Sequence, residues 1–217
     1  MKKLALSLLL AAAVVSATPV AQVKFVGIPA NAPTLGSPKV IVSPYTLSIN
    51  GSNYAALCID FNDESSVGST WNAYVSQVGG DIGNTYNPGS ALQYKEAAWI
   101  YNQITAPGTS AQTKIDLQEA AWYIMDPNYA SGKKAQYGPD TAAMTFVTAA
   151  QNNYNSVNLA NFEIISAVTA HSQQEFLIAT PEPASCALFG VAFLLAGALR
   201  FSRKRQQTAI VTESQTA

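Results

Sequence analysis

The C-terminal end constrains the fold most, because it removes a long stretch of chain from any globular core. Pro181-Glu182-Pro183 would break a helix, and the uncharged apolar stretch Ala184–Leu199 follows it. The sequence then turns basic, with Arg200, Arg203, Lys204 and Arg205. A buried core helix rarely ends in such a cluster, whereas a membrane span oriented by the positive-inside rule does.

The apolar stretch Ala184–Leu199 is long enough for a membrane span only if the residues after it contribute. At about 1.5 Å per helical residue, Ala184–Leu199 is shorter than a bilayer core of about 30 Å. Phe201 can extend it, and Arg200 can snorkel to the interface. We therefore expect a transmembrane helix over 184–201, followed by a polar cytoplasmic tail over 206–217.

The N-terminus predicts a secretory signal peptide over residues 1–17. Lys2 and Lys3 precede the uncharged stretch Leu4–Val15, and small residues follow. This order of charged, apolar and small residues is typical of a cleaved signal. Cleavage is expected after Ala17, with Ala21 as the alternative site. An ordinary N-terminal helix is the other reading, but Thr18-Pro19 would end it without an amphipathic face.

The stretch Thr180–Arg205 resembles the PEP-CTERM sorting signal, in which a Pro-Glu-Pro motif, a short span and a basic cluster stand in this order. The resemblance implies that the chain is the substrate of an exosortase, a membrane transpeptidase of Gram-negative-type bacteria. It also implies signal peptidase and the inner membrane as earlier partners. The expected location is an inner-membrane-anchored precursor, and then the cell surface or extracellular matrix. The polar tail after Arg205 is longer than such signals usually carry.

Residues 18–180 remain as one exported domain, which is a typical domain size. This region holds six lysines, no arginine and eleven acidic residues, so its net charge is −5. Nucleic acid is not an expected partner, because phosphate contacts depend on lysine and arginine.

The order of elements predicts an α+β domain, with strands at both ends and helices in the centre. Asn50-Gly51 is a hairpin turn signal between two of the strands. Pro107-Gly108 separates two of the helices. The expected strands are Gln22–Ile28, Lys39–Ile49, Tyr54–Phe61, Asn161–Thr169 and Gln174–Ala179. The expected helices are Ala91–Gln103, Ala111–Met125 and Pro139–Asn152, and Asn62–Ser90 is expected to form a loop.

Two residues in this domain could carry chemistry. Cys58 is the one cysteine of the domain and lies on a predicted strand, so it cannot form a disulfide within the domain. Gln118 and Trp122 share a face of a predicted helix at the edge of its apolar stripe. A glutamine amide in such a place must find hydrogen-bond partners.

The strand cysteine followed by the helix Leu117-Gln118-Glu119-Ala120-Ala121-Trp122 resembles the thioester domains of bacterial adhesins. The resemblance covers about Tyr54–Asp126. It implies an internal thioester, with Cys58 as the sulfur donor and Gln118 as the acyl donor, that would react with an amine on a surface or matrix component.

Simpler interpretations stay open. Cys58 and Trp122 could be plain core residues, and Gln118 could hydrogen-bond a loop. A secreted hydrolase using Cys58 and His171 is a third alternative. The acidic segment Asp60–Glu64 lacks the spacing of an EF-hand, so a solvated turn is expected there and not a calcium site. We expect a non-enzymatic exported protein without cofactor or metal.

Overall fold

The computed structural model describes residues 20–36, 39–42, 44–126 and 141–180. The predicted signal peptide, the Pro-Glu-Pro motif, the basic cluster and the predicted transmembrane helix therefore lie outside the described residues. In the described part, no helix is both long and apolar enough to cross a membrane. The compact unit that holds the described elements ends at Ala179.

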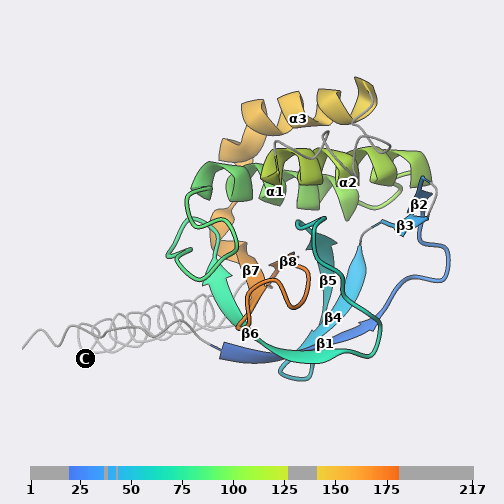
Figure 1. The fold of residues 1–217 in the computed structure, drawn as a ribbon. Coiled ribbons are helices and arrows are strands. Elements are labelled where there is room, and N and C mark those ends of the chain that lie inside the picture. The colour runs from blue at the N-terminus through green and yellow to red at the C-terminus, as the bar shows by residue number, and fades with distance from the viewer. Residues whose placement is uncertain (1–19, 37–38, 43, 127–140, 181–217) are drawn as a thin grey trace, which may run out of the picture. The chain divides into compact units, whose positions relative to one another are not determined.

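Six antiparallel strands close into a barrel in the order β1-β4-β5-β8-β7-β6 (Figure 1). Strand β1 pairs with both β4 and β6, so the barrel is closed and leaves no free strand edge. A separate two-stranded sheet is formed by β2 (Thr34–Leu35) and β3 (Val40–Ile41). The barrel strands are β1 (Val20–Gly27), β4 (Tyr45–Ile49), β5 (Ser52–Cys58), β6 (Thr70–Gln77), β7 (Phe162–Ala167) and β8 (Phe176–Ala179).

Among the described residues, three α-helices follow β6 and stack on one side of the barrel, with α3 farthest from it (Figure 1). They are α1 (Ala91–Ile104), α2 (Ala111–Met125) and α3 (Thr141–Asn153). Short 3-10 turns at Tyr154–Ser156 and Leu159–Asn161 lead into β7. The mixed α+β class expected from the sequence is therefore observed, and its β part is a closed barrel.

Local signals explain where several elements begin and turn. The Ser110 hydroxyl caps α2 by accepting a hydrogen bond from the Thr113 amide at 3.1 Å. The β4–β5 hairpin turns at Asn50 and Gly51, which both have positive φ, as a two-residue hairpin turn of this type requires. Both features agree with the predicted boundaries.

Two predictions about strands were wrong. The segment predicted as the loop Asn62–Ser90 contains β6, which completes the barrel between β1 and β7. Its buried positions are Ala73 and Ser76, so the alternation of apolar residues that marks a strand is weak. The predicted strand Lys39–Ile49 is interrupted near Pro44, which lacks the amide hydrogen needed to continue a ladder.

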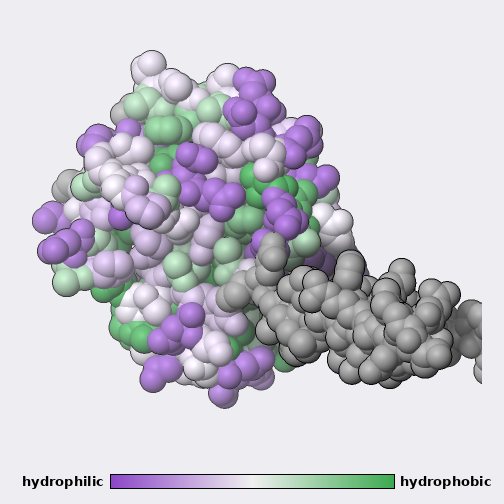
Figure 2. All heavy atoms as spheres, turned by 180° about the vertical axis from the view of Figure 1, so that it is seen from behind, coloured by the Kyte–Doolittle hydropathy of each residue, from purple (hydrophilic) through white to green (hydrophobic). Residues whose placement is uncertain are grey.

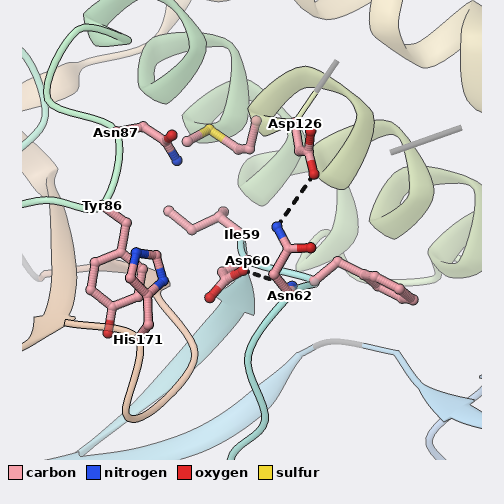
Figure 3. A pocket seen from close by; sticks show the side chains of 9 residues that line it. Ile59, Asp60, Asn62, Tyr86, Asn87, Asp126 and His171 are labelled. Carbon is pink, nitrogen blue, oxygen red and sulfur yellow. Dashed lines mark hydrogen bonds between the residues drawn. The ribbon is translucent and has the colours of Figure 1, made fainter. Parts of the chain in front are cut away.

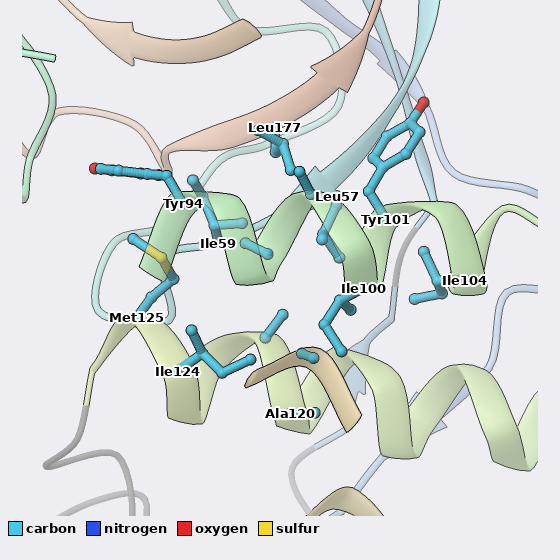
Figure 4. Close-up of a cluster of buried hydrophobic side chains, with 14 of the residues drawn as sticks. Leu57, Ile59, Tyr94, Ile100, Tyr101, Ile104, Ala120, Ile124, Met125 and Leu177 are labelled. Atoms are coloured by element: carbon cyan, nitrogen blue, oxygen red, sulfur yellow. The ribbon is translucent and has the colours of Figure 1, made fainter. Parts of the chain in front are cut away.

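Two cores share the strands that face the helices. Leu57 and Leu177 point toward α1 and α2 and join the outer core, which is the cluster of buried side chains between the barrel and the helices (Figure 4). Their neighbours Cys58, Phe176 and Ile178 point into the barrel. β5 and β8 are thus buried on both faces at this end, which explains their continuous apolar runs.

Candidate functional site

Cys58 and Gln118 meet where α2 crosses the end of β5. The Gln118 side-chain nitrogen Nε2 donates a hydrogen bond of 2.7 Å to the Cys58 carbonyl oxygen, across 60 residues of sequence. Both residues are 0% exposed. The structure therefore brings together the two residues that sequence reasoning paired, in a place that excludes water.

The secondary structure dictates this meeting. Cys58 is the last residue of β5 and faces the barrel interior. On α2, Gln118 and Trp122 are one turn apart, and Trp122 inserts among the barrel residues while the helix itself packs on the outer core. The same helical face thus carries an aromatic ring into the barrel and the amide to the strand end.

The Cys58 thiol is held in its neutral form. It donates a hydrogen bond to the Asp60 carbonyl oxygen, with a sulfur–oxygen distance of 2.9 Å. Burial raises the pKa of Cys58 to about 12, and the nearby Asp60 charge acts in the same direction, while the Trp122 side chain acts against it. A thiol in this environment is a poor nucleophile toward solutes.

Aromatic rings close the site on the side of the β5–β6 loop. The Phe61 ring lies edge-on to the Trp122 indole, with centroids 4.7 Å apart. Trp122 is buried, whereas Phe61 is half-buried. Phe61 is therefore the outer of the two rings.

Behind the site, a buried carboxyl group ties β8 to three other segments. Glu175 Oε1 accepts hydrogen bonds from the Tyr86 amide at 2.8 Å and the Ser166 hydroxyl at 2.6 Å, and Oε2 accepts one from the Tyr94 hydroxyl at 2.7 Å. Burial raises the pKa of Glu175, against the effect of these three donors. The Glu175 carbonyl also accepts the Ile59 amide at 3.0 Å, so this network fixes the residue next to Cys58.

A cavity of about 310 Å³ opens beside the site (Figure 3). Its polar lining includes Asp60, Asn62 and Asp126. The Asn62 side-chain nitrogen Nδ2 donates a hydrogen bond of 3.3 Å to Asp126 Oδ2. The pKa of Asp60 is raised to about 7, first by burial and then by the neighbouring Asp63 carboxyl. The cavity shares the segment after Cys58 and the end of α2 with the Cys58–Gln118 site.

His171 is a loop residue whose side chain is 62% exposed, but it has a specific partner. Its Nδ1 lies 2.8 Å from Asp63 Oδ2, and its ring lies against the Tyr86 ring at an interplanar angle of 38°, with centroids 4.6 Å apart. Sequence reasoning missed the Asp63–His171 contact, which joins residues 108 positions apart.

Two further cavities, of about 330 and 360 Å³, lie elsewhere on the described residues. The face seen in Figure 2 mixes hydrophilic and hydrophobic residues, with small hydrophobic areas separated from one another. Large apolar side chains that are exposed on the described residues include Val20 and Val26 of β1, Val67 of the β5–β6 loop and Leu92 of α1. No protein-family model, curated protein or solved structure matches this chain.

Proposed function

We propose that the exported domain forms an internal thioester between Cys58 and Gln118 and uses it to attach itself covalently to an amine-bearing surface or matrix component. The observation that carries the proposal is the 2.7 Å hydrogen bond from Gln118 Nε2 to the Cys58 carbonyl oxygen, between two fully buried residues. It brings an amide that could act as an acyl donor to the residue that bears the thiol.

The chemistry needs no cofactor. The Cys58 sulfur attacks the Gln118 side-chain carbon, an S–C bond forms, the C–N bond breaks, and ammonia leaves with the thiol proton. A primary amine later attacks the same carbon, an N–C bond forms, the C–S bond breaks, and the sulfur takes a proton. This is nucleophilic catalysis performed once, with the protein as its own substrate, so the domain is not an enzyme.

The surroundings of the pair suit a bond that must last until its target arrives. The barrel interior around Cys58 is lined by apolar side chains such as Phe176 and Ile178, which keep bulk water away. Phe61 and Trp122 cover the approach from the loop side. The high pKa of the Cys58 thiol limits its reaction with dissolved electrophiles before the thioester forms.

Delivery to the surface is the second part of the proposal, and it rests on the sequence. Signal peptidase would remove residues 1–17, and an exosortase-type transpeptidase would process the chain at Pro181-Glu182-Pro183. The span and the basic residues after it would hold the precursor in the inner membrane until then. The compact unit that carries Cys58 and Gln118 ends at Ala179, immediately before this signal.

The intact mass of the mature exported species tests the thioester. The expected mass is lighter than the sequence mass by one ammonia, and treatment with methylamine should add one methylamine. A Cys58→Ala variant should show neither change. If the wild-type protein has its full sequence mass and takes up no methylamine, Cys58 and Gln118 are plain core residues and the proposal fails.

Replacing Pro181-Glu182-Pro183 with alanines tests the delivery. The expected result is a precursor that accumulates in the inner-membrane fraction, while the mass loss in the domain is unchanged. Unchanged release and location would show that the motif is incidental. The two tests are independent, because one reads the sorting step and the other reads the domain.

A further inference from the structure

Two loops at the end of the barrel bring three metal-binding side chains together. Asp60 and Asp63 belong to the β5–β6 loop, and His171 belongs to the β7–β8 loop. One ligand atom from each residue lies within 4.8 Å of the other two. Figure 3 shows Asp60 and His171 side by side at the edge of the cavity.

One oxygen of the cluster needs a partner. Asp60 Oδ1 accepts the Asn62 backbone amide at 2.8 Å, but Oδ2 is buried from solvent and has no hydrogen-bond partner among the described residues apart from a proton shared with the neighbouring Asp63 carboxyl. Buried carboxylate oxygens in native proteins are usually satisfied by a donor, a proton or a cation. This oxygen lies next to a second carboxylate, which makes a positive ligand more favourable still.

Protein cations do not supply that charge. Among the described residues, no lysine or arginine lines the cavity, whereas Asp126 adds a further carboxylate on its far side. The imidazole of His171 is the only basic group in the lining, and it already contacts Asp63.

The imidazole of His171 has contacts on two sides, although its side chain is largely exposed. Its ring lies against Tyr86, whose hydroxyl donates to the Gln173 carbonyl at 2.9 Å and whose amide donates to the buried Glu175. Such support of a ligand side chain by surrounding contacts is characteristic of metal sites.

We propose that Asp60, Asp63 and His171 form a binding site for a divalent transition-metal cation of the zinc or manganese type. Imidazole nitrogen with carboxylate oxygen is a ligand set for these ions, whereas calcium and magnesium take oxygen ligands alone. With metal–ligand bonds of about 2.0–2.2 Å, two ligand atoms on one ion lie at most about 4.4 Å apart, so groups that now lie within 4.8 Å of one another must move closer to bind it. Water in the cavity would complete the coordination.

Binding would replace the Asp63–His171 hydrogen bond and tie the two loops through the ion. The β5–β6 loop also carries Phe61, which covers Trp122, so the ion would fix the outer wall of the Cys58–Gln118 site. The metal site itself does not depend on the thioester, and either can fail without the other.

The test uses the full chain without a polyhistidine tag, freed of metal with a chelator. His171 is the one histidine of the chain, so its imidazole NMR signals report directly on this site. Zinc is expected to bind in a 1:1 ratio by calorimetry, to shift the imidazole signals and to raise the melting temperature. Calcium and magnesium at the same concentration should do none of these.

Three variants locate the binding. His171→Gln and Asp60→Asn should each weaken zinc binding by about tenfold or more, since losing even an outer partner of a ligand costs about 10–100-fold. Glu64→Gln removes a carboxylate from the same loop but outside the cluster, and it should leave the affinity unchanged. Asp60→Asn keeps an oxygen acceptor for the backbone amide of Asn62, so the β5–β6 loop should fold.

The proposal is overturned if zinc does not move the His171 signals, or if both ligand variants bind zinc as the wild type does. Calcium binding that persists in His171→Gln would also overturn it, because the site would then be one of oxygen ligands alone. A weakened affinity in both variants with Glu64→Gln unaffected supports it.

Discussion

Opening the proposed thioester should destabilise the domain by an amount that the chain topology sets. A bond between Cys58 and Gln118 would close a loop of 60 residues. In the chain-entropy description of a cross-link, a loop of this length stabilises the folded state by about 4 kcal/mol at 25 °C. Methylamine breaks the link and leaves a methylated amide at the same buried position. The unfolding free energy of methylamine-treated protein should therefore fall by up to about 4 kcal/mol.

Urea unfolding of treated and untreated protein measures this difference, with Cys58→Ala as the matched control. The slope of unfolding free energy against urea should also rise after treatment, because the unlinked denatured chain is less compact. The slope separates lost linkage from the strain of an added methyl group, which changes the midpoint alone. Cys58→Ala should respond to methylamine in neither respect. A thioester seen by mass whose opening leaves both the midpoint and the slope unchanged would refute the entropic reasoning.

Three further predictions follow from the buried groups. Glu175→Gln should flatten the pH dependence of stability. In the wild type, the folded state keeps a proton on Glu175 above the ordinary pKa of 4.5. The wild-type unfolding free energy therefore falls as the pH rises from about 4.5 through the raised pKa of Glu175. Urea unfolding between about pH 4 and pH 8 checks this, and an equally steep profile in the variant contradicts it. In Gln118→Leu the Cys58 thiol stays free, and it should react with iodoacetamide only after unfolding, since its pKa is about 12; labelling of the native variant would count against the burial. Phe61→Ala should speed methylamine uptake by exposing the edge of Trp122, while the untreated variant should still be one ammonia lighter than its own sequence mass. An unaltered uptake rate would show that Phe61 is not a barrier.

Local signals in the sequence predicted the helices and the β4–β5 turn well. The boundaries of α2 follow from Ser110 at its start and from a continuous helical pattern up to Met125. The turn at Asn50-Gly51 follows from the need for positive φ at both residues. These features depend on neighbours in the sequence, so the sequence alone can predict them.

Closure of the barrel and the Asp63–His171 contact depend on distant segments. Strand β6 buries small or polar residues, and its identity as a strand comes from pairing with β1 and β7. Asp63 and His171 meet only because the β5–β6 and β7–β8 loops lie together at one end of the barrel. The pairing of Cys58 with Gln118 came from a resemblance, since no local pattern links a strand end with a helix 60 residues later.

The single cysteine by itself does not argue for a thioester. With a pKa of about 12, the thiol is ionised at pH 7 in roughly one molecule in 10⁵. Burial alone therefore protects Cys58 from oxidation and exchange in an oxidising compartment. Gln118 is the residue that needs explaining, because an apolar side chain would fill a fully buried position on α2 without the desolvation of an amide. Its hydrogen bond offsets that desolvation and leaves little net gain in stability. The amide satisfies the buried Cys58 carbonyl, and under the proposed function it has a chemical role as well.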